Sequence, residues 1–161
     1  MAISLRNRQK KVPVETRRLR RVGERALSAL ARPTAECSVS LVDDSAMAEL
    51  NHAYRGVTGP PDVLAFPMTE GRLGATSTSP RARAEGPDLL GDVVISAETA
   101  ARQARDRGRD VQGELALLLV HGILHLVGYG HGPAEARRRM WQKQRRILEA
   151  CGVRRPTGRK V

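Results

Sequence analysis

An apolar stretch with two histidines, residues 115–128, constrains the fold of this chain more than any other segment. His121 and His125 are four residues apart, so on a helix both imidazoles lie on the same face, one turn apart. The stretch is shorter than the roughly 20 apolar residues that a membrane-spanning helix needs. It therefore predicts a buried helix in the core of a folded domain, with two imidazoles on one of its faces.

Gly128 and His131 extend this helix into a pattern that zinc hydrolases use. Gly128 can end the helix in a left-handed conformation, so that the chain turns back and His131 joins the other two imidazoles. Three neutral imidazoles and one position open to water are typical of catalytic zinc, whereas structural sites fill all four positions. We expect one Zn²⁺ per chain, held by His121, His125 and His131. The alternative is a set of core histidines, each hydrogen-bonded to a neighbour.

The residue after the first histidine distinguishes this segment from the zinc peptidases. Their signature H-E-x-x-H-x-x-G-x-x-H uses its glutamate as the general base of peptide hydrolysis. Here Gly122 stands in that place. A bound metal could still acidify a water, but the usual proton acceptor is missing, so the sequence predicts a hydrolase whose reaction is not ordinary proteolysis.

Basic residues crowd the two ends of the chain, at residues 6–25 and 137–160, and the formal net charge is +11. Phosphate contacts need this cation density, which makes RNA the expected partner. The alternative is two solvated faces in an arginine-rich composition. No membrane binding is expected, because the basic helices lack opposite faces rich in Trp, Phe or Leu.

The compartment is predicted from the cysteines and from the start of the chain. Cys37 and Cys151 are isolated and are expected to be reduced thiols. Residues 1–8 contain no apolar signal core. Both features favour a cytoplasmic protein.

The order of expected elements indicates a single α+β domain over residues 1–161, with a small mixed sheet and about five helices. Gly, Ser and Pro enrich residues 69–88, which predicts a mobile loop, and a basic tail is expected after about residue 152. Strands are expected near residues 2–8, 37–42, 62–66 and 89–95, and helices near 13–31, 44–54, 97–107, 112–127 and 133–150.

Three blocks in this order carry a resemblance to a known family. They are residues 50–55 with 62–67 (LNHAYR and DVLAFP), residues 90–96 (LGDVVIS) and residues 121–131 (HGILHLVGYGH). On these blocks the chain resembles the YbeY family of bacterial rRNA maturation factors, also described as single-strand endoribonucleases. The resemblance covers most of residues 36–152.

The resemblance implies site residues and a role. It implies that His121, His125 and His131 bind a metal, usually zinc, and that Arg55 is a catalytic residue of the cleft, where its planar fork could hold a phosphate. It also implies a cytoplasmic protein that acts on 16S rRNA and in ribosome quality control. The oligomeric state is left open.

The chain departs from the family pattern at several positions. Gly130 replaces an aspartate beside the third histidine, and Gln144 stands where the family often has an acid; Pro61 and Ala65 also differ. A carboxylate at position 130 could orient a ligand or add charge near the metal. Gly130 and the lack of a general base favour a second interpretation, a non-catalytic ribosome-assembly factor with a mainly structural metal. A metallopeptidase is the third, and Gly122 argues against it.

Other polar and aromatic residues carry less specific expectations. His52 is expected to be solvated, and Asp62 and Asp92 are expected to be turn or cap residues. The four aromatic residues of the chain are few for a protein that reads single-stranded bases by stacking. We therefore expect RNA binding that depends on the phosphate backbone and is weakly selective for sequence, with Trp141 either in the core or exposed.

Overall fold

A mixed four-stranded sheet forms the centre of the protein, which a computed structural model describes at residues 2–55, 61–68, 88–129 and 133–153. The strands lie in the order β1-β2-β4-β3, with β1 parallel to β2, β2 parallel to β4, and β3 antiparallel to β4. Their bounds are β1 Ile3–Asn7, β2 Ala35–Val42, β3 Val63–Pro67 and β4 Asp88–Ser96. β1 and β3 are thus the two edge strands of this sheet.

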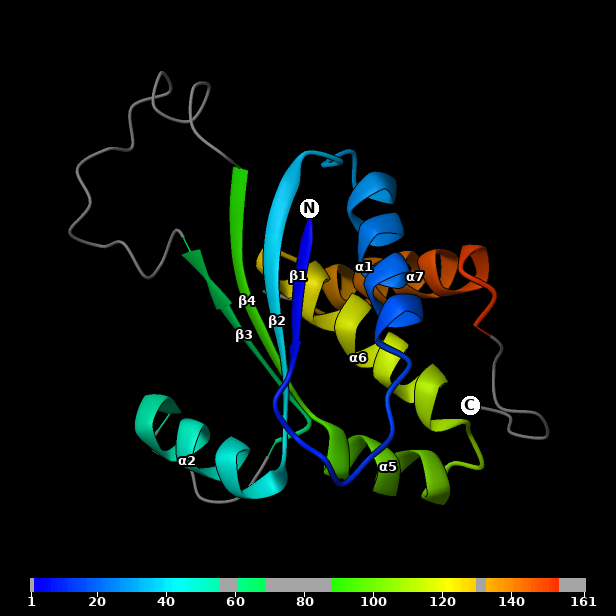
Figure 1. Ribbon diagram of the computed structural model, residues 1–161. Coiled ribbons are helices and arrows are strands. Elements are labelled where there is room, and N and C mark those ends of the chain that lie inside the picture. The colour runs from blue at the N-terminus through cyan, green and yellow to red at the C-terminus, as the bar shows by residue number, and fades with distance from the viewer. Residues whose placement is uncertain (1, 56–60, 69–87, 130–132, 154–161) are drawn as a thin grey trace.

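Helices cover both faces of the sheet (Figure 1). α1 and α6 pack on one face, α7 lies on the outer side of α6, and α2 covers part of the other face, while α5 lies across one end and contacts α6. This arrangement confirms the expected α+β class with a mixed sheet. The bounds are α1 Thr16–Ala29, α2 Asp44–Arg55, α5 Ala97–Asp106, α6 Val111–Leu126 and α7 Ala134–Ala150.

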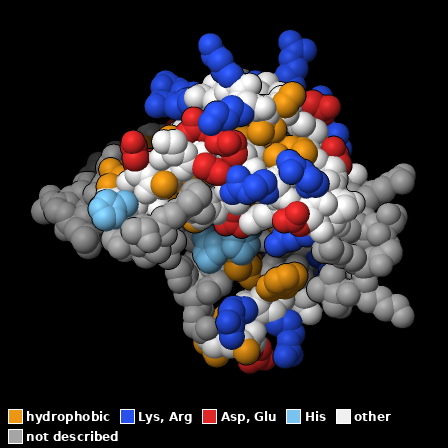
Figure 2. Space-filling view, turned by 90° about the horizontal axis from the view of Figure 1, so that it is seen from below, with side chains coloured by type: hydrophobic (Ala, Val, Ile, Leu, Met, Phe, Trp, Pro, Cys, Tyr) orange, Lys and Arg blue, Asp and Glu red, His pale blue; other side chains and the backbone are white. Residues whose placement is uncertain are grey.

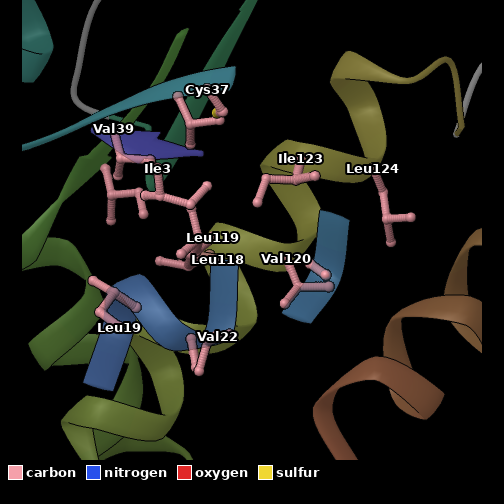
Figure 3. Close-up of a cluster of buried hydrophobic side chains, with 14 of the residues drawn as sticks. Ile3, Leu19, Val22, Cys37, Val39, Leu118, Leu119, Val120, Ile123 and Leu124 are labelled. Atoms are coloured by element: carbon pink, nitrogen blue, oxygen red, sulfur yellow. The ribbon is translucent and has the colours of Figure 1, made fainter. Parts of the chain in front are cut away.

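The predicted buried helix is α6, and it lies at the heart of the main core. It contacts α1, α5, α7, β3 and β4, which explains why it is apolar on nearly every side. Ile3 of β1 and Leu119 of α6 point toward one another, with Leu19 of α1 and Val39 of β2 nearby (Figure 3), and all four are buried. The helix that carries the histidines is therefore held from several directions at once.

A smaller apolar cluster holds α2 on the opposite face of the sheet. Met47 is fully buried there against Val42, Leu64 and Val94, which point away from the α6 side because side chains alternate along a strand. Ala46, Leu50 and Phe66 complete this cluster. Through it, the end of α2 is placed beside the edge strand β3.

A network of polar contacts fixes the junction between α2 and α5. Asp44 accepts hydrogen bonds from Ser96 Oγ, Thr99 Oγ1 and Arg102 Nη1, each at 2.6 Å. Burial alone would raise the pKa of Asp44, but these hydrogen bonds and the charge of Arg102 outweigh it and lower the pKa below its ordinary value. Ser96 also caps α5, since its Oγ accepts from the backbone N–H of Thr99.

A buried ion pair secures the start of α6. Glu114 is fully buried, with Arg107 Nη1 at 3.1 Å and Arg109 Nε at 3.7 Å from its carboxylate oxygens. Burial raises the pKa of Glu114, and the two arginines oppose that effect. The segment before α6 is thereby tied to the helix.

The position of Asp88 differs slightly from the sequence prediction. It was expected in the loop of residues 69–88, but it begins β4, where it pairs with Ala35. Arg32 donates to both of its carboxylate oxygens, at 2.9 and 2.6 Å, and this contact holds the pKa of Asp88 below its ordinary value. Residues 69–87 and the tail from 154 on lie outside the described residues. In the described part of the chain, no helix is long and apolar enough to cross a membrane.

Candidate metal centre and cleft

The two histidines of α6 present their Nε2 atoms to one another. These atoms lie 3.1 Å apart, and the two rings meet edge to face with centroids 4.6 Å apart. A tetrahedral zinc ion with Zn–N bonds of about 2.0–2.1 Å holds two nitrogens about 3.3 Å apart. The spacing between His121 and His125 therefore fits a shared ion without a rearrangement of the helix.

Gln144 of α7 orients the first of these imidazoles. Its Oε1 lies 3.0 Å from Nδ1 of His121, and the Gln144 side chain is buried. An amide oxygen only accepts hydrogen bonds, so Nδ1 of His121 donates this one, and in the neutral ring Nε2 presents its lone pair toward His125. Metal-binding histidines usually have a partner of this kind, which sets the tautomer and the ring direction.

An open cleft of about 590 Å³ lies beside the histidines. Figure 2 shows pale-blue histidine side chains at the centre of one face of the molecule, with hydrophobic and basic side chains next to them. The cleft is bounded by α6, by the edge strand β3 and by the end of α2. Its lining consists of Tyr54, Asp62, Val63, Leu64, Ala65, Phe66, Pro67, His121, Gly122 and His125.

Gly122 is explained by the packing of α6 against the sheet. A Cβ atom at this position would lie 2.7 Å from Cγ1 and 3.2 Å from Cγ2 of Val93, and 3.4 Å from Cγ2 of Val63. The backbone of α6 thus touches β4 and β3 between the two histidines. A glutamate could not occupy this position without moving the sheet, which agrees with the inference that the site is not built for peptide hydrolysis.

The turn after α6 has the predicted geometry. Gly128 has a φ of 99°, in the region that favours glycine. Its N–H donates to the carbonyl of His125 at 3.1 Å, and the N–H of Tyr129 donates to the carbonyl of Leu124 at 3.0 Å. This pair of bonds is the Schellman motif, which ends a helix and reverses the chain direction.

The third expected ligand, His131, lies outside the described residues, as does Gly130. Within residues 2–55, 61–68, 88–129 and 133–153, no group of three His, Cys, Asp or Glu side chains could hold a metal. Two of the three expected ligands, His121 and His125, thus lie in the described part of the chain, and the metal assignment, His131 included, stays a prediction.

The other expected site residues fall in different places. Arg55 is the last residue of α2, whose preceding residue Tyr54 lines the cleft, and the Arg55 side chain itself is not described. Asp62 lines the cleft, with its carboxylate accepting from Val63 N–H at 2.8 Å and from Gln103 Nε2 at 3.3 Å. Asp92 and His52 are exposed, and neither lines this cleft.

The cysteines are free in the structure and lie away from the cleft lining. Cys37 is buried in the core, and burial raises its pKa to about 12. Burial also raises the pKa of Cys151. Both side chains therefore remain thiols near neutral pH, and a thiolate ligand or nucleophile from either is not expected.

Sequence reasoning named Gln144 only as a departure from a family pattern and did not recognise its contact with His121. The signal that could have found it is the helical pattern of α7. Gln144 shares the buried side of the helix with Met140, Ile147 and Leu148. A buried amide requires a hydrogen-bond partner, and the histidines of α6 are such partners.

The amino-acid sequence of this chain is similar to those of several curated proteins. The curated relatives include endoribonuclease YbeY of Geobacter metallireducens, 44% identical over 151 residues, which cover 92% of this chain and 94% of the relative. The endoribonuclease YbeY of Thermobifida fusca is 44% identical over 149 residues and 92% of each chain. That of Salinispora tropica is 50% identical over 114 residues, covering 71% of this chain and 73% of the relative.

A solved structure has a similar fold, and the family pattern matches nearly the whole chain. A solution structure of a protein from Thermotoga maritima has a TM-score of 0.62 and 22% identity, covering 98% of this chain and 99% of that one, and it supports the fold. The sequence pattern of the family described as endoribonuclease YbeY matches residues 4–152. This chain therefore belongs to the YbeY family.

Proposed function

We propose that this chain is a zinc-dependent endoribonuclease that acts in the cytoplasm on 16S rRNA precursors, in rRNA maturation and ribosome quality control. Its curated relatives are named endoribonucleases, which supports hydrolysis of RNA phosphodiester bonds. The observation that carries the proposal is the pair of Nε2 atoms, 3.1 Å apart, in an open cleft.

The residues proposed to hold the metal are His121, His125 and His131. When bound, the ion would lower the pKa of a water and polarise a phosphoryl oxygen. The chain's own contribution is to orient the imidazoles. Gln144 accepts the Nδ1 proton of His121, and the enclosed helix α6 holds the two rings in register.

Substrate binding is assigned to Arg55 and to the basic surface. Arg55 follows Tyr54 at the end of α2, and a guanidinium can bind two phosphate oxygens at once. The exposed arginines of α7 add further positive charge close to Gln144. Contacts of this type attract RNA regardless of its sequence.

A second candidate is a ribosome-assembly factor that binds RNA without cleaving it. Asp62 favours this alternative, because it is the carboxylate among the described lining residues and both of its oxygens already accept hydrogen bonds. A general base is thus not evident in that part of the cleft. Gly122 gives none either, and position 130 has glycine in place of an acid.

The experiment that separates these candidates combines elemental analysis with RNA cleavage by extensively purified protein. Wild type should contain about one zinc per chain and cleave a single-stranded RNA. His125→Ala should lose both the metal and the cleavage. His52→Ala is the matched control, because His52 is exposed on α2 and does not line the cleft; it should retain both.

The outcomes distinguish the two roles. Cleavage that persists at the wild-type rate in metal-free His125→Ala protein would exclude this site as the catalytic centre. Stoichiometric zinc and RNA binding without cleavage by any preparation would support the assembly factor.

A further inference from the structure

Two aromatic side chains are exposed, one in the cleft beside the histidine pair and one on α7. In the described part of the chain, the large hydrophobic side chains exposed to solvent are Tyr54, at 69%, and Trp141, at 63%. The chain has only four aromatic residues in all. Half of this small set is therefore at the surface, where burial does not account for it.

One of the exposed rings, that of Tyr54, lies in the cleft beside the proposed metal centre. Tyr54 of α2 lines the cleft together with His121 and His125. Its ring meets Phe66 of β3 edge to face, with centroids 5.3 Å apart, which supports it from the sheet side. The surface presented by Tyr54 is thus part of the cleft wall.

Trp141 lies on α7, near Gln144, whose side chain contacts His121. The two residues are three apart on α7, so their side chains are neighbours on the helix surface. Gln144 turns inward to His121, while Trp141 remains at the surface. The indole therefore lies about one helical turn from the group that orients the first metal ligand.

Two arginines share the face of α7 that carries Trp141. Arg137 is four residues before it and Arg145 four residues after it, and both are exposed. Neither forms an ion pair with any residue that the structure describes. An exposed ring between cationic side chains is the arrangement that proteins use to stack bases and hold the adjacent phosphates.

We propose that Tyr54, in the wall of the cleft, and Trp141, on the surface of α7, are base-stacking positions for single-stranded RNA, with Arg137 and Arg145 binding the phosphates next to Trp141. This inference rests on the proposed RNA-processing function and adds how the strand is held. It adds base stacking to the sequence expectation of RNA binding that depends mainly on the phosphate backbone. A duplex, whose bases are already stacked, cannot use these positions, so the site selects unpaired RNA.

The test uses the fact that Trp141 is the single tryptophan of the chain. Its fluorescence is followed while chelator-treated protein, which cannot cleave, is titrated with a single-stranded 12-nucleotide RNA. The same titration is repeated with the matched duplex and with an oligomer that has the sugar–phosphate backbone but no bases. Anisotropy of end-labelled RNA measures the affinity independently.

The single strand should quench Trp141 in step with binding, and the abasic oligomer should bind in a salt-dependent way without quenching. Trp141→Ala and Tyr54→Ala should each weaken single-strand binding about 5- to 150-fold, which corresponds to about 1–3 kcal/mol per stacked base. Trp141→Phe should retain most of the affinity. Gln142→Ala, on the exposed side of α7 away from Trp141, is the matched control and should bind like wild type.

Two results would overturn the inference: an indole whose emission is unchanged at saturating RNA, or Trp141→Ala protein that is folded and binds the single strand with wild-type affinity. A surface that instead docks another protein would give these same results. Cleavage is measured separately with zinc restored. Quenching without cleavage would support the stacking site and contradict the proposed nuclease activity. Cleavage without quenching would support the nuclease activity and contradict the stacking site.

Discussion

The contact between α6 and the sheet at Gly122 leads to a sharp prediction for Gly122→Ala. An added Cβ would lie 2.7 Å from Cγ1 of Val93, well inside the 3.5–4.0 Å of a favourable carbon contact. Val93 is fully buried and β-branched, so it has little freedom to move. Overpacking of this kind typically costs about 1–3 kcal/mol.

The helix itself would gain from the same substitution. Alanine is more favourable than glycine inside a helix by roughly 0.5–1 kcal/mol. The difference predicts a net loss of up to about 2.5 kcal/mol of stability for Gly122→Ala, with a central value of about 1 kcal/mol. In a domain of this size, each kcal/mol corresponds to roughly 2–4 °C in Tm.

Gly113 provides the matched control within the same helix. Its added Cβ would meet Val153 Cγ1 at 3.7 Å and Arg109 Cγ at 3.8 Å, which are ordinary contacts. Gly113→Ala should therefore stabilise the protein by about 0.5–1 kcal/mol. Although the two substitutions are chemically identical, their effects on the free energy of unfolding are expected to have opposite signs.

The assay is denaturant unfolding followed by circular dichroism, with chelator present so that metal binding does not add to the stability. Val93→Ala combined with Gly122→Ala should show a favourable coupling energy, because the truncated side chain makes room for the new methyl group. Gly122→Ala protein that is as stable as Gly113→Ala would refute the proposed close contact between α6 and β4.

Four further predictions concern the metal, the substrate and pH. Gln144→Leu should weaken zinc binding about 10- to 100-fold in a competition assay with a chromogenic chelator, and Gln144→Glu should restore it; equal affinities would show that the amide only fills space. Arg55→Lys should lose RNA cleavage while its Tm stays at the wild-type value, because lysine lacks the planar fork; wild-type cleavage would remove Arg55 from the site. RNA affinity should fall steeply with salt, and alanine at residues 137–139 should weaken binding to all sequences alike; affinity that is independent of salt would show that these arginines are only solvated surface. Because the pKa of Asp44 is lowered, its ionised carboxylate stabilises the fold above the unfolded-state pKa, and this stability is lost as pH falls through the folded-state pKa. The difference in unfolding free energy between wild type and Asp44→Asn should therefore disappear below about pH 4 in an acid unfolding series.

The sequence predicted the helices and strands well because local patterns depend on residues close together in the chain. The helix over His121 and His125 and the glycine turn at residue 128 both depend on residues within one or two turns. The strand order β1-β2-β4-β3 depends instead on pairings between distant segments. No periodicity in a single sequence specifies those pairings.

The site was only partly predictable for the same reason. The spacing of the two histidines along α6 predicted that their imidazoles lie close together, and their Nε2 atoms are 3.1 Å apart in the structure. The contact of Gln144 with His121 spans 23 residues and two helices, so it became visible only when α7 was placed on α6. The exposure of Trp141 likewise depends on which side of α7 faces the core, and the sequence left both possibilities open.

The enclosure of α6 has a consequence for the timing of metal capture. Because α1, α5, α7 and two strands surround this helix, its amide hydrogens should exchange with solvent only when the whole domain unfolds. The conformational entropy of bringing His121 and His125 together is then lost during folding, before any ion arrives. Zinc entering the cleft meets two preset nitrogens, so its binding at these positions should resemble a simple bimolecular encounter and should leave the exchange rates of α6 nearly unchanged.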